Sequence, residues 1–211
     1  MPLVRKPPLP ASAPATPSSD TAAVLAALAS GTDDERFSAA RAAAEMPESV
    51  PALREALARE TNAAVREALF SALARIGSPA SVEAVLPYLR SDDALLRTEA
   101  TDALAAMKDA ASASIARLLH DADPDVRILA CTLVRNLPSE TAGPLCCELL
   151  DSEQHPNVCA AAVDALAELG GAAALPALAR CAERFRGTPF LEFAIRTAMD
   201  RIRSQVPNSR A

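Results

Sequence analysis

The sequence predicts an all-α fold, an α-solenoid of about six helical-hairpin repeats that together form an α-α superhelix. Three observations support this prediction. One pattern of apolar residues at helical spacing returns six times along the chain, the apolar residues are mostly small, and turn residues recur between the periodic stretches. The predicted solenoid covers residues 20–205, with tails at 1–19 and 206–211.

The clearest copy of the pattern lies in residues 123–137, DPDVRILACTLVRNL. With Val126 as position zero, apolar residues follow at +4, +7, +8 and +11, which places them on one face of an α-helix. Related copies start 30 to 33 residues apart, with zero positions at Glu35, Val65, Leu96, Val126, Val158 and Leu191. Such regularity indicates internal repeats.

Each repeat predicts two antiparallel helices. The first helices are expected near residues 21–29, 49–59, 80–90, 111–120, 140–150 and 172–184. The second helices are expected near 33–46, 62–76, 93–107, 124–137, 157–169 and 189–203. Residues 1–19 contain six prolines and few core-forming residues, which predicts a disordered Pro-rich tail. Its segment RKPPLP is either a linker or a ligand for an aromatic groove.

Turn residues mark the helix ends. Ser78-Pro79, Asp123-Pro124 and Thr188-Pro189 each place a capping side chain before a proline at the first helical position. Gly77 and Gly170 stand where a left-handed residue ends a helix most easily. Pro87 falls inside a first helix and should bend it.

The segment DPDVRxxA at 123–130, with relatives at 62–69 and 93–100, resembles HEAT-like repeats. It resembles the short repeats of phycobilisome-lyase-type proteins. The resemblance implies a non-catalytic scaffold or adaptor that binds a protein partner. The alternative that it implies is a lyase-like or chaperone subunit acting on a cofactor-bearing protein.

The same resemblance implies a polar ladder, in which acids of the inter-helix turns pair with helix arginines of neighbouring repeats. The arginines stand at position +1, and planar guanidinium groups suit such pairing. They are Arg36, Arg66, Arg97 and Arg127, and the expected acids are Asp33, Asp34, Asp92, Asp93, Asp121 and Asp123. Position +1 becomes Cys159 and Glu192 in the last two repeats, so different polar contacts are expected there.

The charge distribution and the hydropathy of the chain disfavour nucleic acids and membranes as partners. Residues 20–170 carry 24 acidic against 12 basic residues, whereas residues 171–211 carry 7 basic against 3 acidic residues. An acidic solenoid disfavours nucleic acid, which needs a continuous positive track. No run approaches 18 apolar residues and the start lacks a signal-peptide pattern, so we expect a cytoplasmic protein with no membrane partner.

The sequence contains no residue pattern typical of a catalytic site. Its five cysteines form no C-x-x-C pair and are expected to be small apolar fillers of a reduced protein. His120 and His155 lie in equivalent turns, and neither is followed by a glutamate. Phosphate-binding and nucleophile motifs are absent from the sequence. The prediction is therefore no enzyme, no catalytic residue, no metal and no cofactor.

The expected binding surface is the concave side of the solenoid, lined by the second helices. Position +2 points away from the core, and position +5 lies on the flank, where neighbouring helices can cover it. Apolar residues recur in these two rows, which suggests a contact surface for a protein of unknown identity, and the solenoid is expected to be a monomer. The predicted partner-binding residues are Phe37, Phe70, Ile128, Arg135, Val163 and Phe193.

Overall fold

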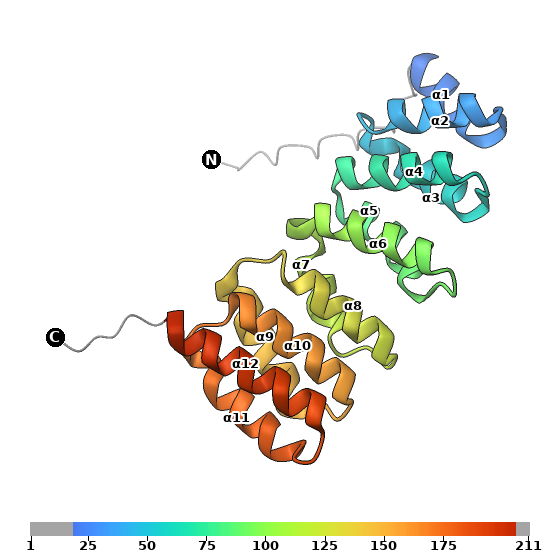
Figure 1. The fold of residues 1–211 in the computed structure, drawn as a ribbon. Helices are drawn as coiled ribbons and strands as arrows, with labels where there is room; N and C mark the ends of the chain where they lie inside the picture. Colours follow the sequence, from blue (N-terminus) through green and yellow to red (C-terminus); the bar gives the residue numbers. More distant parts are fainter. Residues whose placement is uncertain (1–18, 206–211) are drawn as a thin grey trace, which may run out of the picture.

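A computed structural model describes residues 19–205, and this part of the chain forms one stack of six helix pairs (Figure 1). The first helices are α1 (Ser19–Ser30), α3 (Val50–Arg59), α5 (Pro79–Val85), α7 (Lys108–Leu118), α9 (Ser139–Ser152) and α11 (Leu175–Arg184). The second helices are α2 (Asp33–Ala43), α4 (Ala63–Ile76), α6 (Ala94–Ala106), α8 (Pro124–Val134), α10 (Pro156–Leu169) and α12 (Pro189–Gln205). The predicted all-α solenoid is confirmed.

Three short 3₁₀ segments complete the described elements: η1 (Pro47–Ser49), η2 (Leu86–Arg90) and η3 (Ala172–Ala174). The segment η2 continues α5 and begins beside Pro87, as expected for a residue that has no N–H to donate to the carbonyl four residues earlier. The predicted tail at 1–19 lies outside the described residues except for Ser19, and the tail at 206–211 lies wholly outside them.

The helix ends mostly follow the predicted signals. The Ser78 hydroxyl accepts a hydrogen bond from the Ser81 amide, and the Asp123 carboxylate accepts one from the Asp125 amide. Gly77 has φ +60° and ends α4 in the left-handed conformation. Gly170 does not, because its backbone is extended. A side chain there would instead collide with the Leu166 carbonyl oxygen, 2.4 Å from the position of a Cβ atom, so close packing explains this glycine.

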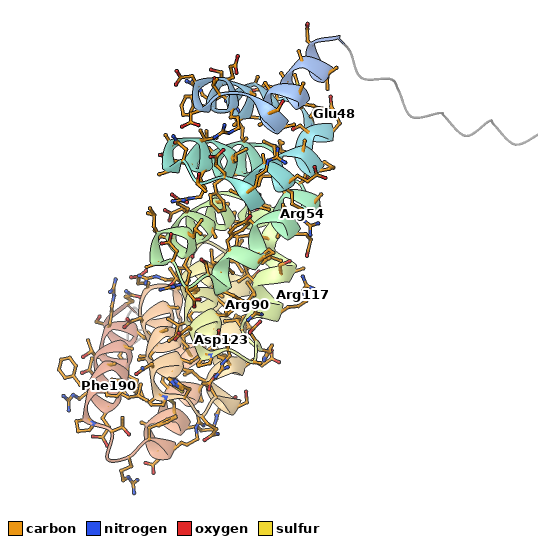
Figure 2. The ribbon with its side chains drawn as sticks, turned by 90° about the vertical axis from the view of Figure 1, so that its right-hand side faces the viewer. Glu48, Arg54, Arg90, Arg117, Asp123 and Phe190 are labelled. Carbon is orange, nitrogen blue, oxygen red and sulfur yellow. The ribbon has the colours of Figure 1, made fainter. Side chains whose placement is uncertain are left out.

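The second helices form the inner layer of the stack. At four of the five junctions between described repeats, adjacent second helices pack more extensively than adjacent first helices, and α7 and α9 hardly touch. When the helices of one layer lie closer together than those of the other layer, the stack curves toward the closer layer. The second helices therefore lie on the inner side of the curve. Figure 2 shows Arg54 and Arg117 of the first helices at one edge of the stack and Phe190 of α12 at the opposite edge.

The polar ladder exists, but its rungs at the position +1 arginines use glutamates in place of the predicted aspartates. Arg36 Nε lies 2.7 Å from Glu60 Oε2, Arg66 Nε lies 2.8 Å from Glu99 Oε2, and Arg127 Nε lies 2.7 Å from Glu153 Oε2. Each pair joins neighbouring repeats. Among the predicted aspartates, Asp121 does join neighbouring repeats, through Arg90, whereas Asp93 and Asp123 cap their own helices and Asp33 pairs with Arg36 of its own helix.

The rung at Glu153 binds several donors. Its carboxylate accepts hydrogen bonds from Arg127 and from the amides of Gln154 and His155. Burial of Glu153 opposes its ionisation, but these hydrogen bonds outweigh burial and lower its pKa below the ordinary 4.5. Because the folded-state pKa is the lower one, this carboxylate stabilises the fold above pH 4.5 and loses that contribution as the pH falls through the folded-state pKa.

Leu104 tests the stacking register. It stands at position +8 of α6 and is fully buried, whereas Leu95 on the same helix is 52% exposed. Leu104→Ala should reduce the free energy of unfolding by about 2–5 kcal/mol, because it leaves a cavity in the core. Leu95→Ala is the matched control and should change it by less than about 1 kcal/mol in the same urea titration. Equal losses would show that the repeat register is misassigned.

Arg127 tests the ladder. Arg127→Met leaves the buried Glu153 carboxylate without its cation and should cost about 3 kcal/mol at neutral pH. Arg117→Met removes an exposed pair with Glu83 and should cost less than about 1 kcal/mol. Urea unfolding between about pH 7 and pH 3.5 should show a weaker pH dependence for Arg127→Met than for the unchanged chain, since the Glu153 pKa is then less depressed. An unchanged pH profile would contradict a ladder role.

Candidate functional site

The candidate site is the exposed inner surface of α2, α4, α6, α8, α10 and α12, called here the second-helix face. Positions −1, +2 and +6 of these helices share one side, because they lie three to four residues apart. Large apolar side chains are exposed in these rows at Phe37 (36%), Leu95 (52%), Phe190 (51%) and Phe193 (61%). Exposed apolar residues gathered on one face indicate a contact surface.

Two of the predicted partner-binding residues stand on this surface as expected, namely Phe37 and Phe193. Each carries an arginine over its ring: Arg41 lies 5.9 Å from the centre of the Phe37 ring, and Arg196 lies 5.5 Å from that of Phe193. These two Phe–Arg pairs stand on the first and last second helices. They therefore mark the two ends of the second-helix face.

Two other predicted residues are buried, and their place in the binding set is corrected. Phe70 is 3% exposed and packs edge-on against Tyr88, with ring centres 5.3 Å apart. Val163 is fully buried. Both stand at position +5, which the following repeat covers. Ile128 and Arg135 are intermediate cases: Ile128 is half-buried against the core, and Arg135 is exposed but pairs with Glu168 of α10.

A hollow of this face lies between α4 and α6. It holds about 390 Å³ and is lined by apolar atoms of Phe70, Ala74, Leu95 and Ala103 together with polar and acidic residues. Three acids surround it, Glu67, Glu99 and Asp102. Glu99 pairs with Arg66, but within the described residues neither Glu67 nor Asp102 has an ion-pair partner. The hollow thus combines an apolar floor with uncompensated negative charge.

Leu95 was not predicted from the sequence, because the apolar rows of the expected binding surface were +2 and +5. It stands at position −1, three residues before +2 on the same side of the helix. The same row holds Phe190 in α12. Both residues lie one helical turn before position +2, so the spacing of the repeat alone is sufficient to identify them.

Potential metal ligands and thiols form a second group of candidate residues in the described part of the chain. No group of three or more His, Cys, Asp or Glu side chains is placed to hold a metal ion in residues 19–205. The five cysteines, all in the described part, are free thiols, and burial raises the pKa of Cys146 to about 12 and also that of Cys131. A neutral thiol is a poor nucleophile. None of the helices between residues 19 and 205 is long and apolar enough to cross a membrane.

The comparisons with known proteins gave one family match and several similar solved structures. A sequence profile of HEAT repeats matches residues 21–105 and 111–186. Among curated proteins, none matches this sequence. Similar solved structures include an archaeal HEAT-like repeats protein from Thermococcus onnurineus NA1, 14% identical with a TM-score of 0.49 over 87% of each chain. Human deoxyhypusine hydroxylase is 17% identical, with a TM-score of 0.43 over 90% of this chain and 86% of its own. An engineered protein is 19% identical, with a TM-score of 0.43 over 89% and 98%.

Aspartate substitutions test which residues form the surface. Phe193→Asp should change the free energy of unfolding by less than about 1 kcal/mol, because the ring is exposed and only its contact with Arg196 is lost. Val163→Asp should cost more than about 3 kcal/mol or prevent folding, because it buries a charge without a partner. Circular dichroism and urea unfolding distinguish them. A stable Val163→Asp variant would show that position +5 belongs to the exposed surface after all.

Proposed function

This chain belongs to the HEAT repeat family, and from that premise we propose that it is a non-catalytic scaffold or adaptor. It binds a protein partner along the second-helix face. The hollow between α4 and α6 is the centre of that surface. The observation that carries the proposal is Leu95, a large apolar side chain 52% exposed beside a hollow of about 390 Å³.

The energetics favour one or two anchors. Apolar anchors that fill pockets dominate the binding energy of most interfaces, and the contacts around them mainly exclude water. Leu95 and Ala74 supply the apolar wall and floor for one such anchor. Phe37 and Phe193 supply secondary contacts near the ends of the face. A helix or an extended segment of the partner fits a groove between two parallel-running helices.

The charges define the complementary partner. Glu67 and Asp102 flank the hollow, and Asp164 continues the acidic row on α10, with no ion-pair partner for any of the three among residues 19–205. A segment with an apolar side chain beside lysine or arginine satisfies both features. Nucleic acid does not, because its phosphates would face unpaired carboxylates.

The lyase-like or chaperone alternative remains a prediction that rests on the resemblance of the repeats. A cofactor-bearing client would leave a visible absorption band in material that copurifies with the protein. A colourless complex with one stoichiometric protein would support the scaffold.

Affinity capture with quantitative mass spectrometry tests the proposed surface. Leu95→Asp should lower the amount of a specific captured protein at least tenfold, which corresponds to about 1.4 kcal/mol, while thermal unfolding stays unchanged. The control is Arg54→Asp, an exposed change on α3 at the opposite edge of the stack (Figure 2), and it should capture as the unchanged chain does.

The salt dependence of capture is a second test of the same surface. Capture through Glu67 and Asp102 should weaken as the ionic strength rises from about 0.05 to 0.5 M, because exposed charges are screened. Equal loss of capture in the Arg54→Asp and Leu95→Asp variants, or none in either, would place the binding surface elsewhere.

A further inference from the structure

The N-terminal end of the stack exposes a surface that every later repeat buries. Position +7 of the second helices is Ala42, Ala72, Ala103, Leu133, Ala165 and Ala198. The last five are at most 6% exposed, whereas Ala42 is exposed. The helix α2 has its own first helix and a following repeat, as the others do. In the described part of the chain it lacks only a preceding repeat, so position +7 belongs to the contact with the preceding repeat.

The residues at position zero show the same difference in burial between the first repeat and the later ones. Val65, Val126, Val158 and Leu191 are buried at this position, and Leu96 is half-buried. In α2 the residue is Glu35, which is exposed. Within residues 19–205, therefore, nothing covers the stacking surface of the first repeat.

This exposed surface, called here the N-terminal end groove, lies between α1 and α2. It encloses about 480 Å³, and six of its lining residues are small or apolar: Ala23, Val24, Ala27, Ser38, Ala39 and Ala42. Asp34 and Glu35 stand at one end, close to the turn between the two helices. The groove is thus apolar along its length and acidic at the α2 start.

The other end of the stack is different. Position +5 is buried at Ala40, Phe70, Cys131 and Val163, where a following repeat covers it. In α12 the residue is Arg196, which is exposed and charged. Repeat proteins need a polar outer face at each terminal repeat to remain soluble. The C-terminal end meets this requirement at Arg196, and the N-terminal end groove does not.

We propose that residues 1–18 of this chain cover the N-terminal end groove and act as its cap. This segment joins α1 directly and contains Leu3, Val4 and Leu9 among its prolines, with two basic residues, Arg5 and Lys6, and no acidic residue. Its apolar residues and prolines match the alanine-rich groove. Its two cations match the carboxylates of Asp34 and Glu35.

The length of the segment is sufficient. The α1 helix has 12 residues and is about 18 Å long at 1.5 Å per residue. A polyproline segment advances about 3.1 Å per residue, so about six residues cover that length after a reversal near Ser19. Arg5 and Lys6 are 14 and 13 residues away from Ser19. They reach the acidic end with several residues left for the turn.

Tethering makes a weak contact effective. A segment joined by a short linker has an effective concentration in the millimolar range. A contact with a dissociation constant of about 1 mM is then about half occupied. The composition that prevents this segment from forming a core of its own does not prevent such docking, because the groove supplies the apolar partner.

Photo-crosslinking in the full chain tests the placement. A benzophenone amino acid in place of Leu9, irradiated and mapped by mass spectrometry, should react within the same chain with peptides of α1 and α2. The same probe in place of Phe190 on α12 is the control and should not capture those peptides. Crosslinks from position 9 to the α4–α6 hollow, crosslinks between two chains, or no crosslink above the control would each overturn the proposal.

Charge reversal tests the polar part. Full-length Arg5→Glu/Lys6→Glu should exchange the backbone amides of α1 and α2 about twofold faster than the unchanged chain, the change expected when half occupancy is lost. The exchange of α10 and α12 serves as the internal reference and should not change. Adding Asp34→Lys to this variant should restore part of the protection. Unchanged exchange in α1 and α2, or protection that depends on protein concentration as a second copy would require, would overturn the proposal.

Discussion

The close approach of neighbouring second helices is the constraint on which the rest of the structure depends. Alanine occupies position +7 in five of the six second helices, and such a small residue lets the preceding repeat pack near the backbone. Larger residues at position +8, such as Leu73, Leu104 and Leu166, fill the space behind it and are fully buried. Contacts of this kind reach only the adjacent repeat, so stability is a sum of neighbour terms. Removing one neighbour therefore exposes one complete surface, as the N-terminal end groove shows.

The polar ladder joins neighbouring repeats by oriented ion pairs. It is interrupted at the junction between the third and fourth repeats. Arg97 donates to the carbonyls of Ser91 and Asp92 in its own turn, and it has no carboxylate partner in the next repeat within the described chain. The residue that would receive it is Asp121, which is one methylene shorter than Glu60 or Glu153 and is bound by Arg90. The same junction has the sparsest contact between second helices, α6 with α8. A missing rung and sparse packing at one junction make it the place where the curvature of the stack changes at least cost.

The period of the sequence determined much of the fold, because a 30-to-33-residue repeat fixes both the number of helix pairs and the residues that face the core. It did not determine which flank each following repeat covers. Phe70 and Val163 share position +5, and only the packing distance between repeats decides that this row is buried. The ladder acids were missed for a similar reason: Glu60 and Glu153 stand at the ends of first helices, where their distance from an arginine 24 or 26 residues away depends on the stacking angle. Leu95 could have been found, because position −1 follows from the period alone.

The acids of the second-helix face are the charges that the fold does not use. The arginines at position +1 pair with acids of the ladder or bind turn carbonyls, which leaves Glu67, Asp102 and Asp164 without a described cation. Neighbouring helices lie about 8–10 Å apart, which is close to the Debye length of about 8 Å at physiological ionic strength. Repulsion along the row is therefore weak enough for the folded state to tolerate. A basic segment that crosses several helices contacts these acids one after another at short range, so each attraction is stronger than the screened repulsion between neighbouring acids. The same spacing that makes the acidic row harmless to folding makes it selective for an extended, positively charged partner over a compact one.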